Sequence, residues 1–244
     1  MYHFRFNLPN ADQNAATLFL PSKHHSNVPA IVSCYGSDKS HWPVRLEEGL
    51  HKLLVDKRET GFLIMQLAGD SDDLSAAACK RRTANLSEMM AWLRVRRYYN
   101  ANKIGLFAFG SAAASALRFA EEINVASFVI ATVTDETARA YAAMGIVNEA
   151  PDEPGMDILD AFIAERLKNA QIPVLILRGT TGQVTIQSGT SKSEDVVIQK
   201  EAATNSTYIL FKGADYYMYN IVKQATGEID KWMKSIGVIE GSGK

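Results

Sequence analysis

Cysteine is scarce in this sequence, and long hydrophobic runs are missing from it. The two cysteines, Cys34 and Cys79, lie far apart in segments of different kinds. Such a pair provides neither a disulfide framework nor the spacing of a metal site, so a reducing compartment fits. No stretch approaches the roughly 18 apolar residues of a membrane span, and the N-terminal residues lack the features of a signal peptide. We therefore expect a soluble, cytoplasmic protein that makes no membrane contact.

An excess of charge of either sign is also missing. The chain has 26 Lys and Arg against 27 Asp and Glu, a formal net charge of -1. This balance creates no general field that attracts nucleic acid. Two basic clusters, 80–82 and 94–97, fall on one predicted amphipathic helix, and we interpret them as a solvated face. We expect a small-molecule ligand or a protein partner, no nucleic acid, no metal and no cofactor, and we leave the oligomeric state open.

What the sequence does contain is a regular alternation of apolar segments. Hydrophobic residues make up 47% of the 244 residues, enough for one α/β domain over residues 1–240 followed by a flexible tail at 241–244. An antiparallel hairpin is predicted around Asn10–Asp12. The predicted buried strands are Ala30–Cys34, Phe62–Leu67, Ile104–Phe109, Ser127–Val133, Val174–Leu177 and Tyr208–Phe211.

Helical spacing appears between these strands. The predicted helices cover Leu46–Leu54, Leu86–Leu93, Ala112–Ile123, Asp135–Met144, Ile158–Leu167 and a last segment through Ile221, Ile229 and Trp232. Strands that alternate with helices predict an α/β, doubly wound, mostly parallel sheet, here with an N-terminal antiparallel hairpin. The loop at Pro151–Gly155 leaves room for a minimal cap.

Three segments carry a resemblance to a known family. The first, "PAIVSCYGSDKSHWP", is a strand that ends in an aromatic–glycine pair. The second, "KIGLFAFGSAAASALRFA", is a strand, a sharp turn and a helix of small residues. The third is "IPVLILRGTTGQV" followed by "STYILFKGADYYMYN". Their order and spacing resemble the α/β-hydrolase superfamily, particularly its dienelactone-hydrolase-like and small serine-esterase members, over nearly the whole chain.

This resemblance implies a catalytic triad in the chain order serine, acid, histidine, with the serine at the apex of the sharp turn. The family pattern places small residues two before and two after the apex. Centring it on Gly110 puts Ala108 and Ala112 there, whereas centring it on Ser111 puts the bulky Phe109 where strand and helix approach each other. The pattern therefore predicts Gly110 at the apex, a residue that adopts such a turn easily but has no nucleophilic side chain.

Two interpretations of Ser111 stay open. As the first residue of the following helix, its hydroxyl would cap backbone N–H groups. Alternatively, it is a displaced nucleophile and the fallback catalytic residue.

The other two triad positions are also substituted on this alignment. All five histidines, the last of them His51, precede the turn, so none follows the last strand as the family order requires. The histidine position falls on Tyr216, whose phenol is a poor base at neutral pH. The acid position falls on Gly182, with Asp135 as an alternative acid that has no histidine to orient. His41 is a weaker candidate base, and Cys34 is interpreted as a core residue.

A ligand in an open α/β sheet binds beyond the carboxyl ends of the strands. The predicted ligand-binding residues at these ends are Tyr35, Gly36, Ser37, Ser111, Arg178 and Tyr216.

The favoured hypothesis is a catalytically degenerate α/β-hydrolase-like protein, with no catalytic residue, that binds a small carbonyl or carboxylate ligand or a protein partner. The alternatives are an esterase-like hydrolase using Ser111, a triad-free lyase or isomerase using Tyr216, and a purely structural subunit.

Overall fold

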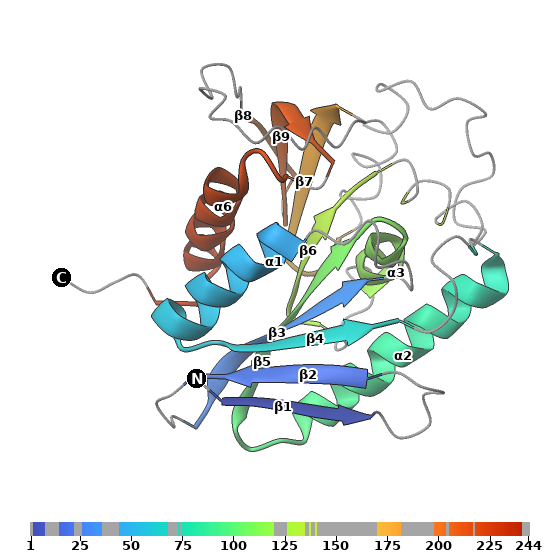
Figure 1. The fold of residues 1–244 in the computed structure, drawn as a ribbon, viewed down its shortest axis with the longest axis vertical. Helices are drawn as coiled ribbons and strands as arrows, with labels where there is room; N and C mark the ends of the chain where they lie inside the picture. The colour runs from blue at the N-terminus through green and yellow to red at the C-terminus, as the bar shows by residue number, and fades with distance from the viewer. Residues whose placement is uncertain are drawn as a thin grey trace.

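The computed structural model describes residues 2–7, 15–21, 26–35, 44–67, 73, 75–119, 126–134, 137, 140, 170–181, 198–203, 205–216 and 218–240. These residues form a nine-stranded sheet covered by helices on both faces (Figure 1). The strands are β1 (Tyr2–Asn7), β2 (Ala15–Leu20), β3 (Val28–Tyr35), β4 (Gly61–Gln66), β5 (Tyr99–Phe109), β6 (Phe128–Thr132), β7 (Val174–Thr181), β8 (Ile198–Ala203) and β9 (Ser206–Asp215).

The sheet is mostly parallel. Its strand order is β1-β2-β4-β3-β5-β6-β7-β9-β8. Pairing is parallel from β4 through β9, whereas β1 with β2, β2 with β4, and β8 with β9 are antiparallel at the two edges. The predicted fold class, including the N-terminal antiparallel hairpin, is confirmed.

The described helices lie in two layers. They are α1 (Val44–His51), the π-helix η2 (Lys52–Lys57), α2 (Ala76–Arg94), α3 (Ser111–Phe119) and α6 (Val222–Ser235). One hydrophobic cluster joins α2 and α3 to one face of the sheet, and a second cluster joins α1, η2 and α6 to the other. Central strands are therefore apolar on both faces, as β6 illustrates with all five residues buried.

Two elements differ from the sequence prediction. The edge strand β8 was not predicted; its sequence IQKEAA is polar and reads poorly as a strand because an edge strand needs no apolar faces. Strand β5 begins at Tyr99, five residues earlier than predicted. Tyr99 pairs with Val28 before a shift of register, and the residues between it and Ile104 include no apolar run that would have predicted a strand. The helices predicted at Asp135–Met144 and Ile158–Leu167 lie wholly or mostly outside the described residues.

One interpretation of the basic clusters is wrong. Arg82 does not belong to a solvated face: its side chain is 0% exposed, and its Nη2 donates a hydrogen bond to the carbonyl of Asp73 at 2.8 Å. Helix α2 turns this residue inward beside Cys79 and Leu86, so the arginine is part of the core layer. A long side chain packs its aliphatic stem in the core while its guanidinium bonds to the backbone.

Candidate functional site at the carboxyl edge of the sheet

The sharp turn lies between β5 and α3. Strand β5 ends at Phe109, α3 begins at Ser111, and Gly110 between them has a φ of 51°. A positive φ is strained for most residues and easy for glycine. Gly110 is thus the residue of this turn with the unusual backbone conformation. Ser111 lies in the first turn of α3, and 3% of its surface is exposed.

Small side chains let the strand and the helix approach each other. Ala108 and Ala112 are both fully buried. Phe109 lies on the opposite face of the sheet, where its ring packs edge-on against Phe107 with centroids 4.4 Å apart. The aromatic ring is thus kept away from the start of α3, in agreement with the steric argument that centred the turn on Gly110.

A threonine after β6 holds this turn in place. The Thr137 hydroxyl donates to the carbonyl of Gly110 at 2.8 Å, and the N–H of Ala113 donates to the same carbonyl at 3.1 Å. Thr137 Oγ1 in turn accepts a hydrogen bond from the N–H of Thr134 at 3.0 Å. The sequence pattern did not reveal Thr137, because a threonine five residues beyond the end of a strand has no distinctive spacing.

The parallel strands bring four of the predicted site residues to one edge of the sheet. Tyr35 ends β3, Ser111 follows β5, Arg178 lies near the end of β7, and Tyr216 follows β9. Carboxyl ends of parallel strands share an edge, so these residues line the same side of the molecule. Tyr35 and Tyr216 are partly exposed there.

Arg178 lies level with the turn. Phe109 pairs with Thr132 on β6, and Thr132 pairs with Leu177 on β7. The residues that follow these three, Gly110, Val133 and Arg178, therefore lie beside one another across the sheet. Val133 belongs to the cluster under α3, and strand alternation places Arg178 on that same face. Its backbone is two strand spacings, about 10 Å, from that of Gly110, and its side chain is 3% exposed.

The turn after β9 is built around a buried carboxylate. Asp215 is 1% exposed, and its two carboxylate oxygens accept hydrogen bonds from the N–H groups of Tyr219 and Asn220 at 3.2 and 3.3 Å. Its backbone also approaches β7 so closely that a Cβ on Gly179 would overlap the carbonyl of Asp215. This turn fixes where the chain leaves the sheet at Tyr216.

The histidine whose side chain is described lies at the other end of the molecule. His51 ends α1, and its ring packs at a tilt against Phe19 with centroids 4.3 Å apart. The ring centroid of Phe62, near the start of β4, lies 6.1 Å away. Burial lowers the pKa of this imidazole and Lys52 adds to the effect, while Asp56 opposes it. His51 is therefore a packing residue at the amino edge of the sheet.

Cys34 lies within the core. It is 0% exposed, and its thiol donates to the carbonyl of Phe107 at 3.5 Å. Burial raises the pKa of the thiol well above its usual range, so the reactive thiolate is disfavoured.

Several predicted positions fall outside the described residues: Gly36, Ser37, His41, Asp135 and Gly182. Within the described ranges, three or more His, Cys, Asp or Glu side chains never gather as a metal site would require. None of the helices in these ranges has the length and apolar character needed to span a membrane.

Solved structures with a similar fold include esterases and a dienelactone hydrolase. Est1E from Butyrivibrio proteoclasticus is 14% identical, with a TM-score of 0.60 and coverage of 96% of this chain and 98% of that one. Esterase Est2 from Thermogutta terrifontis is 15% identical with a TM-score of 0.61, covering 100% and 95%. Dienelactone hydrolase from Anabaena variabilis is 12% identical with a TM-score of 0.57, covering 96% of each chain. No protein-family model matches the sequence, and no curated protein does.

These similarities extend over almost the full length of both chains, so they concern the whole architecture and not one motif. Together with the strand order and the turn between β5 and α3, they define the class: the chain has the α/β-hydrolase fold.

Proposed function

We propose that this protein is a catalytically degenerate α/β-hydrolase-like protein that binds a small carbonyl or carboxylate ligand at the carboxyl edge of its sheet. The observation that carries the proposal is the glycine with a φ of 51° between β5 and α3. The fold's nucleophile position is the apex of this turn, and glycine provides the turn without a nucleophile.

The position of Ser111 supports this proposal. A nucleophile on a strained apex projects into the site, whereas Ser111 lies one residue further, within α3 and almost fully buried. Its hydroxyl replaces the missing nucleophile only if the turn reorganises. The hydrogen bond from Thr137 to the Gly110 carbonyl opposes such a movement.

The distribution of possible bases supports it as well. In the α/β-hydrolase superfamily the general base is a histidine that comes last of the three triad residues in the chain. The residue aligned with this histidine is Tyr216. No histidine follows His51 in the sequence. A serine hydroxyl without an imidazole to take its proton is a weak nucleophile at neutral pH.

Binding without turnover uses what remains of the site. The first N–H groups of a helix have no partner within the helix and carry a partial positive charge. At the start of α3 they suit an oxyanion or a carboxylate. The guanidinium of Arg178, level with the turn and on the α3 side of the sheet, adds positive charge to this region. A carbonyl or carboxylate compound is the ligand class that such an environment favours.

Labelling with a fluorophosphonate probe tests the absence of a nucleophile. We expect the wild-type protein to remain unlabelled at pH 7 under conditions that label a serine esterase completely. Labelling that disappears in Ser111→Ala contradicts the proposal and identifies Ser111 as a nucleophile.

Turnover of p-nitrophenyl acetate tests the enzymatic alternatives in parallel. We expect hydrolysis no faster than in buffer, and no change in Ser111→Ala or Tyr216→Phe. Hydrolysis that falls at least ten-fold in either variant, while the variant keeps its wild-type unfolding midpoint, supports an enzyme instead.

A further inference from the structure

Thr134 has a buried hydroxyl without a hydrogen-bond partner. This residue lies two positions beyond β6 and is 6% exposed, and among the described residues no polar group bonds to its Oγ1. Both of its backbone groups are satisfied by Thr137. The N–H of Thr134 donates to Thr137 Oγ1, and its carbonyl accepts from the N–H of Thr137, each at 3.0 Å. A buried hydroxyl costs free energy unless it forms a hydrogen bond, so an unpaired one calls for an explanation.

The neighbouring threonines use their hydroxyls differently. Thr132 Oγ1 donates to the carbonyl of Ala108 at 3.1 Å, and Thr137 Oγ1 donates to the carbonyl of Gly110 at 2.8 Å. These two hydroxyls hold the end of β5 and its turn in place. The Thr134 hydroxyl takes no part in this framework, so its hydrogen bond is left for a molecule from outside the chain.

Thr134 belongs to the carboxyl-edge site. Val133 on the β6 side lies beside Gly110 on the β5 side. The residues that follow these two are Thr134 and Ser111. The Thr137 hydroxyl also links the two segments, because it bonds both to the N–H of Thr134 and to the carbonyl of Gly110. Thr134 therefore lies one strand spacing, about 5 Å, from the start of α3.

The start of α3, a helix of nine residues, supplies the other donors of this site. The N–H of Ala113 donates to the carbonyl of Gly110 at 3.1 Å, whereas the N–H groups of Ser111 and Ala112 have no acceptor within the helix. A ligand oxygen bound to these groups has the Thr134 hydroxyl as its neighbour. Donors that lie only one strand spacing apart match a ligand whose two oxygen-bearing carbons are adjacent.

We propose that Thr134 is a specificity residue of the carboxyl-edge site, and that it selects acids with an oxygen on the carbon next to the carboxylate: 2-hydroxy and 2-oxo acids. The carboxylate binds the N–H groups at the start of α3, and the neighbouring oxygen binds the Thr134 hydroxyl. A threonine hydroxyl suits both kinds of acid, because it donates to an oxo group and either donates to or accepts from a hydroxyl. The inference rests on the proposed function, since it requires that this site binds a carboxylate.

Titration of the full chain with lactate and with propionate, followed through the amide chemical shifts of the protein, tests this inference. The two acids have the same carbon chain and differ only in the 2-hydroxyl. We expect lactate to bind about five-fold to ten-fold more tightly than propionate, because it satisfies the buried hydroxyl. Pyruvate is expected to share this advantage.

Substitutions of Thr134 assign the preference to its hydroxyl. Thr134→Val keeps the shape of the side chain and is expected to raise the Kd of lactate about five-fold to ten-fold while leaving that of propionate unchanged. Thr134→Ser, which keeps the hydroxyl, is expected to keep the preference for lactate.

Urea unfolding without ligand tests whether the hydroxyl is unpaired in the fold. Thr134→Val is expected to keep or raise the unfolding midpoint, because it removes a buried polar group that has no partner. Thr132→Val is the matched control. It deletes the hydroxyl that donates to Ala108, so its midpoint is expected to fall while its preference for lactate remains.

The negative results are distinct from one another. Equal affinities of the wild type for lactate and propionate overturn the inference but leave the proposed function in place. An equal loss of both affinities in Thr134→Val also overturns it, since the residue then supports the site without choosing the ligand. A midpoint that falls as far in Thr134→Val as in Thr132→Val means that the hydroxyl is bonded within the fold, and this too overturns the inference. If neither acid binds, the proposed function fails, and the inference fails with it.

Discussion

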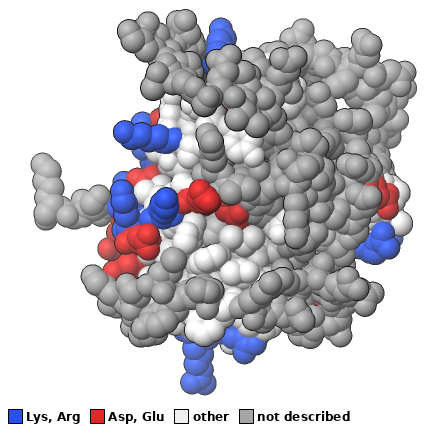
Figure 2. Space-filling view, in the orientation of Figure 1, with Lys and Arg blue, Asp and Glu red and all other residues white. Residues whose placement is uncertain are grey.

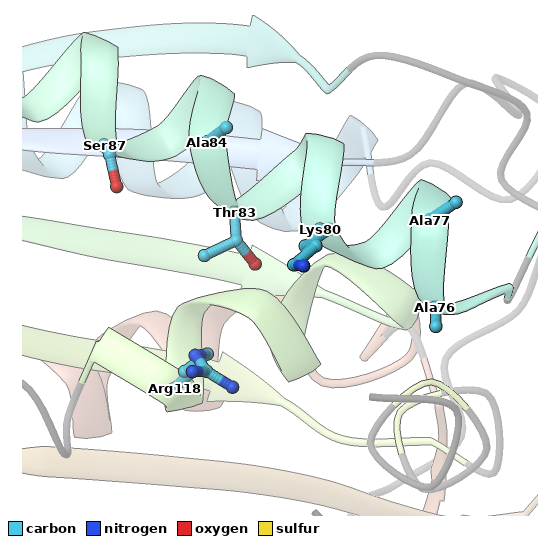
Figure 3. A pocket seen from close by; sticks show the side chains of 7 residues that line it. All are labelled: Ala76, Ala77, Lys80, Thr83, Ala84, Ser87 and Arg118. Carbon is cyan, nitrogen blue, oxygen red and sulfur yellow. The ribbon is translucent and has the colours of Figure 1, made fainter. Parts of the chain in front are cut away.

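The two faces of the sheet are covered in different ways. On one face, α1 and α6 lie side by side and in direct contact, and basic and acidic side chains are interspersed over them (Figure 2). On the other face, α2 and α3 also touch, but a cavity with two cations in its lining, Lys80 and Arg118, remains between them (Figure 3). The same sheet therefore supports one closed layer and one layer that contains a cavity.

Close approach and ion pairing explain the closed layer. A Cβ on Gly49 of α1 would lie only 2.9 Å from Cγ1 of Val222, so the glycine is what lets α1 and α6 meet. Arg58, just after η2, binds both carboxylate oxygens of Asp230 on α6 at 2.7 and 2.9 Å. Lys234 Nζ donates to the same carboxylate at 2.6 Å.

The open layer has a different composition. Helix α3 is rich in alanine and is buried along nearly its whole length, so it lies close to the sheet. Its neighbour α2 also presents alanines on its outer side, and small side chains cannot fill the space between two helices. The contrast shows that the alanines on the outer side of α2 leave volume beside this helix, whereas α1 and α6 are in close contact.

The largest expected loss of stability comes from a substitution in the sheet beneath α6. In Gly105→Ala the new Cβ would overlap the ring of Phe128, which itself contacts Trp232 of α6 with centroids 6.1 Å apart. We expect a loss of about 3 kcal/mol in the free energy of unfolding, since overpacking displaces a buried ring and the helix on it. Urea unfolding measures this loss.

The matched control for this change is Gly227→Ala on α6, where a Cβ would meet no atom within 4 Å. This variant is expected to gain about 0.5–1 kcal/mol from helix propensity. If both alanine variants are equally stable, the tight contact between α6 and the sheet is not what closes this layer.

A smaller effect is expected on the open layer. Arg82→Ala removes a fully buried side chain and its hydrogen bond to the carbonyl of Asp73. We expect a destabilisation of about 2 kcal/mol, because packing and a charge-assisted hydrogen bond are lost together. Thermal unfolding of Arg82→Ala and Arg81→Ala compares the two neighbours. If both variants lower the unfolding temperature by the same small amount, the Arg82 side chain is exposed to solvent like that of Arg81.

The smallest expected effect concerns the ion pairs of α6. Asp230→Asn is expected to cost about 1.5 kcal/mol at pH 7, the value typical of hydrogen bonds to a charged group. Lys223→Gln, an exposed charge on the same helix, is the control and is expected to change stability by less than about 0.5 kcal/mol.

The pH dependence sharpens this prediction. Burial of Asp230 acts to raise its pKa, but the hydrogen bonds and charges of Arg58 and Lys234 outweigh it and hold the pKa below its ordinary value. The folded protein thus binds fewer protons than the unfolded chain, so this stabilisation is complete at neutral pH and is lost as the pH falls below about 4. The difference in urea midpoint between wild type and Asp230→Asn should shrink on acidification; a constant difference would argue against the ion pairs.

Much of the fold could be predicted from local patterns. Apolar runs such as Ile104–Phe109, alternating with helices, were sufficient to predict a doubly wound sheet. A strand that is apolar on both faces needs helices on both sides of the sheet to cover it. The polar strand β8 and the π-helical continuation of α1 could not be predicted, since each depends on a neighbour: β9 for the first, and the packing of Leu54 and Val55 for the second.

The candidate site was predictable only in part. Sterics around Ala108 and Ala112 located the turn on Gly110, whose φ of 51° fits that prediction. The hydrogen bond from Thr137 to the turn and the position of Arg178 beside it could not be predicted, because both depend on segments distant in sequence.

By itself, the sequence determined the alternation of strands and helices, the glycine at the turn after β5 and the absence of any histidine beyond it. These are properties of residue type and order, and they hold whatever the packing. Only the tertiary structure decided that Arg82 is buried while Lys80 is not, and that two cations face one cavity. Lys80 and Arg82 point about 200° apart around the axis of α2, and only the packing of α2 against α3 and the sheet sets which of the two directions faces the core.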